Sequence, residues 1–250
     1  TEGLVGSEMC IRDRVGEFGI ELLHWQGLAR AIAFAVEWEM VVVASYADRE
    51  FLYCDFCDQF IAIKSTSPHT AGPKCRGLEL TPKQVFNSFE YSTDAGDMLI
   101  SPHGPIARYR HFSAAASAIS NFRNFSKGLA KTNRKFDLLI HARATEKSGQ
   151  GNKNWPIQNW LAFLETLPSN LRVASVGSKN GAHKIQGTED LRGIELERFA
   201  QHCKSAQMII GPSSGAIHFA LHCGTPALTW MGEHRHHYFP QWNPFECLLI

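Results

Sequence analysis

The sequence has almost no excess of charge and no long apolar run. Its 25 Lys and Arg residues are nearly matched by 24 Asp and Glu residues, which leaves a net charge of +1. A chain without a strong positive field is poorly suited to bind duplex nucleic acid or an anionic membrane through bulk electrostatics. Its longest apolar runs, such as residues 40–44, are far shorter than the ~20 residues that span a bilayer. We therefore expect no nucleic-acid partner and no transmembrane segment; a peripheral membrane contact stays open.

Metal-binding patterns are scarce as well. The seven cysteines are scattered, and Cys54 and Cys57 are the one close pair, without Cys or His partners at zinc spacing. This pair fits two small apolar residues in a reducing cytoplasm better than a metal or redox site. His234, His236 and His237 lie close together without a carboxylate or cysteine partner, which is a weak indication of a metal; their role stays open. We expect no metal, no cofactor and a cytoplasmic protein.

The two ends of the chain differ in character from what lies between them. With 250 residues, 44% of them hydrophobic and 20% charged, the sequence suits a soluble protein of two domains. Residues 1–14 show no periodicity that continues into the chain, and they resemble a translated sequencing adapter. We predict that they are a non-native tail in place of a lost first strand. Residues 243–250 end on an apolar run without a cap, which indicates a truncation there too.

A clean alternation of strands and helices marks the second half of the sequence. Apolar runs predict the strands, and amphipathic spacing predicts the helices. The strands are expected at 136–142, 171–177, 207–211 and 226–230, and the helices at 157–167, 195–206 and 214–223. Such an alternation with short connections is typical of a parallel, doubly wound α/β sheet. Residues 136–250 are therefore predicted to form a Rossmann-like domain, whose ligands bind at the carboxyl ends of the strands.

The first half shows the same periods less clearly. Residues 64–105 are rich in Ser, Thr, Pro and Gly and receive no assignment. Elsewhere the pattern predicts helices at 21–38, 48–57 and 107–125, and strands at 40–45 and 60–63. We predict an incomplete Rossmann-like domain at 15–125 and a polar linker at 126–135.

One stretch of the second half combines small residues with a histidine. The predicted strand that ends at Gly211 is followed by Ser213, Ser214 and Gly215, and a helix then places His218 one turn beyond Ser214. The first N–H groups of a helix have no internal partner and carry partial positive charge. Glycine allows a ligand to approach closely, and serine and histidine add donors. The pattern favours either an anion site suited to a diphosphate or an ordinary serine cap with a satisfied histidine.

This stretch resembles the donor-binding motif of the heptosyltransferase family, which reads Asp-Ser/Thr-Gly-x-x-His and continues to Gly-Thr-Pro. Ser214, Gly215 and His218 match the motif, and residues 224–226 are Gly-Thr-Pro. Ser213 stands where the family has aspartate. The resemblance implies a glycosyltransferase with two Rossmann-like domains, the GT-B fold. It also implies that the C-terminal domain binds the diphosphate of the donor through residues 213–215 and His218.

Two cations precede this motif. Residues 151–167 are similar to the family's Lys-Arg-Trp-Pro segment, with Lys153 and Trp155 in register and Asn154 in place of the arginine. A lysine reaches a phosphate as a point charge, whereas Arg143, just after the first strand of this domain, offers a bidentate fork. The alternatives are a solvated loop residue for Lys153 and a surface salt bridge for Arg143.

The third match is N-terminal. Residues 15–27 resemble the family's glycine-aspartate turn, with Glu17 in place of the aspartate. In the family this carboxylate is taken as the base that activates the acceptor hydroxyl. A glutamate at this place can instead simply stabilise the start of the following helix.

The resemblance implies a sugar transferase of the hexosyl or heptosyl type. Its donor would be a nucleotide-diphospho-sugar, and its acceptor would be a hydroxyl of a glycan or glycolipid. No Asp-x-Asp motif occurs in the sequence, so we expect metal-independent transfer in which cations and a helix end stabilise the departing diphosphate. Two alternatives remain, a sugar-nucleotide epimerase of the same fold and a non-catalytic nucleotide-sugar-binding fragment. The sugar, the nucleotide, the acceptor and the oligomeric state stay open.

Overall fold

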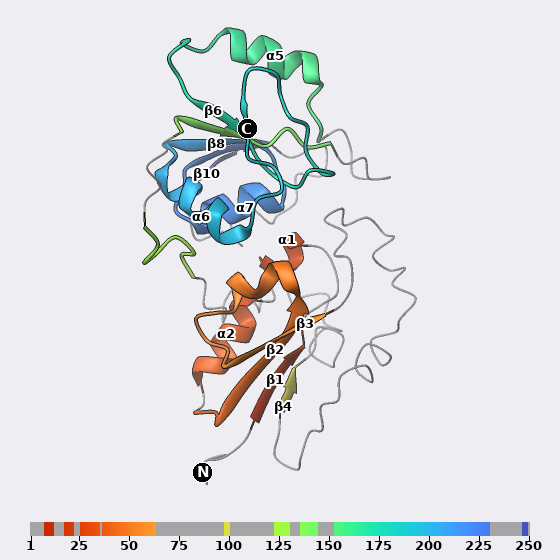
Figure 1. Ribbon diagram of the computed structural model, residues 1–250, viewed down its shortest axis with the longest axis vertical. Helices are drawn as coiled ribbons and strands as arrows, with labels where there is room; N and C mark the ends of the chain where they lie inside the picture. Colours follow the sequence, from red (N-terminus) through yellow and green to blue (C-terminus); the bar gives the residue numbers. More distant parts are fainter. Residues whose placement is uncertain are drawn as a thin grey trace. The chain divides into compact units, whose positions relative to one another are not determined.

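The chain forms two compact units, Thr1–Phe122 and Arg123–Ile250, in a computed structural model. Each unit contains its own parallel sheet (Figure 1). The structure describes residues 8–12, 18–22, 26–35, 37–63, 98–100, 123–130, 136–144, 153–230 and 247–249.

The first unit is built on a four-stranded sheet in the order β3-β2-β1-β4. Its strands are β1 (Glu8–Arg12), β2 (Met40–Tyr46), β3 (Gln59–Ile63) and β4 (Met98–Ile100). β2 contains three successive valines, of which Val43 is fully buried. The sequence predicts β2 and β3, whereas β4 lies in the part of the sequence that received no assignment.

The strand β1 comes from the segment that the sequence analysis placed outside the fold. It pairs in parallel with β2 on one side and with β4 on the other, so that Cys10 is in register with both Val42 and Leu99. Without β1, the facing edges of β2 and β4 would expose unpaired backbone groups. The position of the first strand, predicted to be lost, is therefore occupied by residues 8–12. The foreign origin of residues 1–14 stays a prediction.

The helices of the first unit depart from the predicted pattern. Within the helix expected at 21–38, residues 21–22 form a π-type turn directly after α1 (Phe18–Ile20), and residues 26–35 form α2 (Gln26–Ala35). Residues 37 and 38 are not helical. The helix expected at 107–125 lies almost entirely outside the described residues, and its last residues, 123–125, are not helical.

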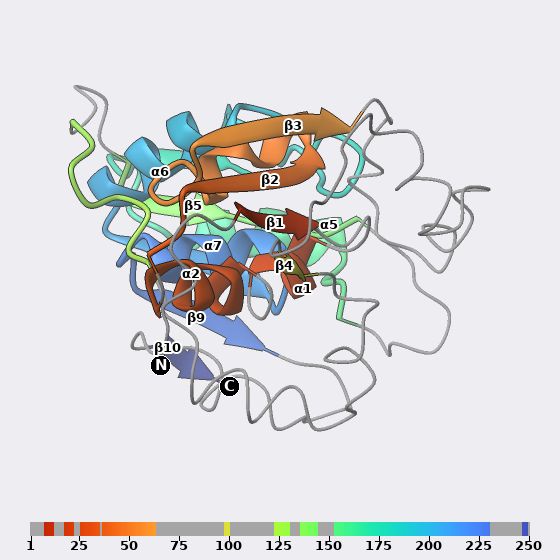
Figure 2. The ribbon, with the colours of Figure 1, turned by 90° about the horizontal axis from the view of Figure 1, so that it is seen from below.

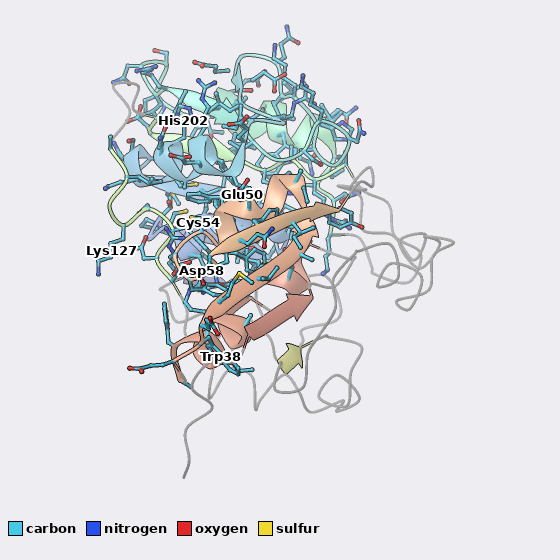
Figure 3. The ribbon with its side chains drawn as sticks, turned by 60° about the horizontal axis from the view of Figure 1, so that its bottom comes forward. Trp38, Glu50, Cys54, Asp58, Lys127 and His202 are labelled. Atoms are coloured by element: carbon cyan, nitrogen blue, oxygen red, sulfur yellow. The ribbon has the colours of Figure 1, made fainter. Side chains whose placement is uncertain are left out.

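The β2–β3 connection also differs from the helix predicted at 48–57. It is a 3-10 helix, η2 (Ala47–Leu52), followed by turns, and Figure 3 labels Glu50 and Cys54 within it. Cys54 is exposed, Cys57 is half-buried, and neither forms a disulfide. Burial, together with the neighbouring Cys54, raises the pKa of Cys57 to about 11. A thiol with a raised pKa is a poor nucleophile and metal ligand at neutral pH.

The second unit is built on a six-stranded sheet in the order β10-β9-β8-β5-β6-β7. Every strand and helix predicted for residues 136–230 is present, and β7 and β10 are additional; β9 and β10 lie side by side (Figure 2). The elements are β5 (Leu138–Ile140), α5 (Ile157–Glu165), β6 (Val173–Ser175), β7 (Glu189–Asp190), α6 (Leu196–Ser205), β8 (Met208–Pro212), α7 (Gly215–His222), β9 (Ala227–Trp230) and β10 (Cys247–Leu249).

Helices cover both faces of this sheet, as a doubly wound fold requires. Figure 1 shows α5 on one face and α6 and α7 on the other. Trp160 of α5 is fully buried in a cluster that includes Leu138 and Ile210. On the opposite face, Phe199 of α6 stacks on Phe219 of α7 with ring centroids 5.4 Å apart. The core of the second unit therefore forms from the apolar stripes by which its elements were predicted.

The described part of the predicted linker packs on the second unit. The N–H of Phe125 donates to the carbonyl of His222 at 2.9 Å, and the hydroxyl of Ser126 donates to the carbonyl of Cys223 at 2.8 Å. Residues 126–130, expected to connect two domains, belong to the second compact unit, which begins at Arg123. No helix among the described residues is long and apolar enough to cross a membrane.

Candidate functional site

The strand order of the second sheet determines where a ligand would bind. The chain runs from β5 to β6 and β7 on one side, and then to β8, β9 and β10 on the other. All of these pairings are parallel, so the carboxyl ends of the strands share one edge. In open α/β sheets, ligands bind at this edge where the strand order reverses. Here that point lies between β5 and β8.

The strand β8 leads through small polar residues into α7. Ser213 and Ser214 follow Pro212, and α7 begins at Gly215. Ser214 occupies the cap position, yet its hydroxyl forms no cap hydrogen bond, and the oxygen is enclosed without a partner among the described residues. An enclosed hydroxyl without a partner costs about 1–3 kcal/mol. A ligand oxygen at the start of α7 would satisfy it.

His218 lies one turn into α7 on the same side as the serines. Its Nε2 is 3.5 Å from the Oγ of Ser213, and its side chain is 7% exposed. The backbone N–H of His218 donates to the carbonyl of Ser214 at 3.0 Å. The structure therefore brings together the motif residues that the sequence predicted to bind a diphosphate.

Arg143 reaches the same edge from β5. Its backbone forms a bridge with Ala182, and its Nη1 donates to the Oδ1 of Asn154 at 2.7 Å. Asn154 is the residue that replaces the arginine of the family pattern. In this chain its amide holds the guanidinium of Arg143, which brings Arg143 next to the segment that contains Lys153.

Trp230, at the end of β9, connects that segment with the serine turn. Its indole Nε1 donates to the carbonyl of Lys153 at 3.1 Å, while its own carbonyl accepts the N–H of Ser213 at 2.9 Å. Trp155 and Trp160 pack against it with ring centroids 5.7 and 5.8 Å away. Trp230 thus fixes the backbone of Lys153 near the start of α7. Sequence reasoning missed this role, because Trp230 was only the last residue of a predicted strand.

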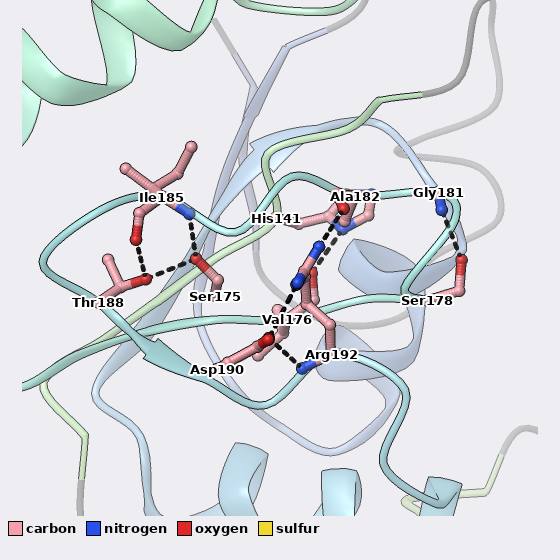
Figure 4. A network of polar contacts seen from close by, with 10 residues as sticks. All are labelled: His141, Ser175, Val176, Ser178, Gly181, Ala182, Ile185, Thr188, Asp190 and Arg192. Atoms are coloured by element: carbon pink, nitrogen blue, oxygen red, sulfur yellow. Dashed lines mark hydrogen bonds and ion pairs between the residues drawn. The ribbon is translucent and has the colours of Figure 1, made fainter.

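His141 follows β5 directly, at the centre of this edge. Its Nδ1 lies 3.1 Å from the carbonyl oxygen of Val176 (Figure 4). A carbonyl only accepts, so Nδ1 carries the proton and Nε2 is an acceptor when the ring is neutral. Burial lowers the pKa of His141 to about 4, which keeps the ring neutral at pH 7.

Two glycines make room for His141. A Cβ added to Gly177, whose φ is +114°, would lie 2.6 Å from the His141 Nδ1, and a Cβ added to Gly211 would lie 2.6 Å from the His141 carbonyl oxygen. Sequence reasoning missed all of these residues as parts of the site. The sequence did contain a signal: the predicted strands at 171–177 and 207–211, which flank the strand before His141, both end in glycine.

Polar contacts fix the connection that follows β6 (Figure 4). The hydroxyl of Ser175 accepts the N–H of Ile185 at 3.0 Å. Arg192 donates to Asp190 at 2.8 and 2.9 Å and to the carbonyl of Ala182 at 2.9 Å. The hydrogen bond from Arg192 lowers the pKa of Asp190 to about 2. Because Ala182 bridges to Arg143, this connection also supports the backbone of the candidate site.

Some predicted features lie outside the described residues, namely Glu17 and the histidines at 234, 236 and 237. Within the described part of the chain, no group of three or more His, Cys, Asp or Glu side chains could hold a metal ion.

Comparisons with known proteins identify the fold. A scan against protein-family models and a search of curated proteins find no match. Solved structures do match. A glycosyl transferase of family 9 from Veillonella parvula DSM 2008 has a TM-score of 0.58 at 12% identity, over 100% of this chain and 88% of that chain. E. coli heptosyltransferase WaaC with ADP-2-deoxy-2-fluoro heptose has a TM-score of 0.58 at 12% identity, over 97% and 92% of the two chains.

A third structure has the same fold in a longer chain. The iron-containing dodecameric glycosyltransferase TibC from enterotoxigenic E. coli H10407 has a TM-score of 0.58 at 14% identity, over 93% of this chain and 61% of that chain. The likeness to these structures confirms the predicted architecture. The chain has the fold of the heptosyltransferase-like glycosyltransferases, with Rossmann-like units of the GT-B type.

Proposed function

We propose that this chain is a glycosyltransferase that binds a nucleotide-diphospho-sugar at the carboxyl edge of the second sheet and transfers the sugar to an acceptor hydroxyl. The observation that carries the proposal is the enclosed, unpartnered hydroxyl of Ser214 at the start of α7. It lies where the strand order reverses, at the same edge as Arg143. A structure with the same fold contains an ADP-sugar analogue, which supports a donor of this class.

The diphosphate of the donor would lie against the first turn of α7. The free N–H groups of that turn, the hydroxyls of Ser213 and Ser214, and His218 would donate to its oxygens. Arg143 and Lys153 would offset the negative charge that grows on the nucleoside diphosphate as the sugar leaves. The hydrogen bond from Arg143 to Asn154, 2.7 Å long, would hold the guanidinium ready for this contact.

Glu17 is our candidate for the base that accepts the proton of the acceptor hydroxyl. Base catalysis contributes about 10²–10⁴-fold to a rate. We expect Glu17→Gln to lower kcat about 100-fold or more and to leave the donor affinity nearly unchanged, because the loss falls on the transition state. Steady-state kinetics and donor calorimetry measure the two effects. A variant with normal turnover and a stability loss of up to about 1 kcal/mol would make Glu17 a helix-start residue.

Incubation of the chain with nucleotide sugars, without an acceptor, separates the proposed function from its alternatives. A transferase that passes sugar slowly to water releases the nucleoside diphosphate. An epimerase inverts a sugar centre and keeps the donor intact, and a binding fragment changes nothing. The acceptor, a glycan or glycolipid, and the cytoplasmic location remain predictions. Metal-independent transfer requires that turnover survives treatment with a chelator.

Calorimetry with nucleoside diphosphates tests the assigned donor site directly. We expect His218→Ala and Lys153→Ala each to weaken binding by about 1.5–3 kcal/mol, because each removes a charge-assisted contact. Lys127, an exposed lysine of the same unit, provides the matched control as Lys127→Ala. Equal affinities for all of these variants and the wild type would remove both residues from the site.

A further inference from the structure

Arg49 of the first unit is a buried cation with unused donors. Its side chain is 2% exposed, and its Nε forms no hydrogen bond with a described residue. The nearest acceptors form only ion-pair contacts with Nε, Glu21 at 3.7 Å and Asp48 at 3.4 Å. The ring of Phe18 covers the guanidinium at 4.3 Å from the ring centroid. Its terminal nitrogens likewise have no hydrogen bond within the part of the chain that the structure describes.

Arg30, a second buried arginine of the first unit, shows the hydrogen bonds that a purely structural guanidinium forms there. It is also 2% exposed, yet its Nε and Nη2 donate to the carboxylate of Asp55 at 2.8 and 3.1 Å. Its Nη2 also donates to the carbonyl of Leu52 at 2.9 Å, and its Nη1 donates to Gln26. Every nitrogen of Arg30 is therefore occupied. A buried guanidinium whose hydrogen bonds are missing is costly, so the contrast with Arg49 calls for a functional reason.

The described groups around Arg49 contact its guanidinium through two ion pairs and one aromatic ring, without a hydrogen bond. Glu21 is 1% exposed and is fixed through its Oε1, which accepts from the hydroxyls of Tyr53 at 2.9 Å and Ser45 at 3.1 Å. For both Glu21 and Asp48 the ion pair is with the Nε of Arg49. The edge formed by Nη1 and Nη2 makes no hydrogen bond with a described residue. Two parallel N–H groups on this edge match the oxygens of a carboxylate or phosphate.

The position of Arg49 in the fold also points to a ligand. β2 ends at Tyr46, and Arg49 lies in η2, which follows it directly. Arg49 thus lies at the carboxyl edge of a parallel sheet, where ligands of such sheets bind. We propose that the terminal edge of Arg49 binds an anionic group, a carboxylate or a phosphate, of a ligand of the first unit. Glu21 acts as a positioning residue that holds the guanidinium from the Nε side.

Site-resolved NMR of the full chain tests this proposal, and it does not depend on sugar transfer. The Nε–Hε signals of Arg49 and Arg30 are followed during titration with inorganic phosphate, sodium acetate, or sodium chloride of equal ionic strength. We expect the Arg49 signal to shift saturably with phosphate, acetate or both, and the Arg30 signal to stay in place. The anion that gives the shift identifies the class of ligand. A shift that chloride reproduces, or no shift at all, would overturn the proposal.

Two substitutions separate binding from structure. Glu21→Gln keeps the size of the side chain but removes its charge, so we expect the apparent affinity of the anion, read from the Arg49 signal, to fall at least threefold. Arg49→Gln should lower the midpoint of unfolding of the first unit less than Arg30→Gln, because Arg49 has fewer hydrogen bonds to lose. Equal losses of stability, together with an unchanged affinity in Glu21→Gln, would assign Arg49 a structural role only.

Discussion

Gly177 and Gly187 together test how tightly His141 is enclosed. Both have positive φ values, +114° and +84°, but only a Cβ at Gly177 would meet the His141 ring, at 2.6 Å, whereas Gly187 has nothing within 4 Å. Gly187→Ala should therefore cost only the backbone strain of about 1–2 kcal/mol. Gly177→Ala adds an overpacking cost of about 1–3 kcal/mol. Urea unfolding measures the difference; equal midpoints would show that His141 has room to move.

His141 should make the second unit sensitive to acid. Its pKa is about 4 in the folded chain and 6.5 in the unfolded chain, because burial disfavours the charged ring. The contribution of the neutral His141 ring to the free energy of unfolding is thus fully present above pH 6.5. It is lost as the pH falls toward 4, by about 1.4 kcal/mol per pH unit at most. We expect the wild type to lose about 2 kcal/mol more than His141→Asn between pH 7 and pH 5. Urea unfolding at both pH values measures this; parallel losses would contradict it.

The sequence predicted which residues form the site better than it predicted the contacts between them. The motif at Ser214, Gly215 and His218 is local in sequence, so its arrangement on one helix start follows from helical geometry. The contact between Trp230 and Lys153 spans 77 residues. Such a contact depends on strand order, which the sequence does not encode locally.

At the scale of elements, the two units differ in how well the sequence predicted them. In the second unit the strands are short apolar runs between amphipathic helices, and the pattern alone located them. In the first unit the apolar period over 21–38 continues through the π-type turn at 21–22, so the period alone does not distinguish that turn from an α-helix. The short strand β4 has too few residues for any period to appear.

The helix α7 allows ligand binding to be separated from helix capping. Ser214 makes no cap hydrogen bond, so Ser214→Ala should change stability by less than the ~1 kcal/mol of an ordinary cap. It should weaken nucleoside-diphosphate binding about tenfold. Thr225, whose hydroxyl donates to the carbonyl of Cys203 at 2.9 Å, gives the reverse case. Thr225→Ala should lower the midpoint of unfolding and leave the affinity unchanged. A destabilised Ser214→Ala variant with full affinity would return Ser214 to a capping role.

At the scale of the whole molecule, the two units should respond independently to the loss of β1. This strand pairs with both β2 and β4 in the first unit, whereas the contacts given above for the candidate donor site lie within residues 123–250. Deletion of residues 1–12 would leave the facing edges of β2 and β4 without a partner. We expect the deletion to abolish cooperative unfolding of the first unit. Nucleoside-diphosphate binding by the second unit should persist.

Calorimetric scanning and ligand titration of the deleted chain measure the two outcomes separately. Substitution of Val43, which is fully buried in β2, by Asp provides a matched control, since it damages the same sheet without removing a strand. If the deleted chain keeps the unfolding transition that Val43→Asp removes, residues 8–12 contribute nothing to the sheet. The tail predicted from the sequence would then be foreign to the fold, and β2 and β4 would have to pair in another way. If donor binding disappears together with the first transition, the second unit depends on the first for its folding.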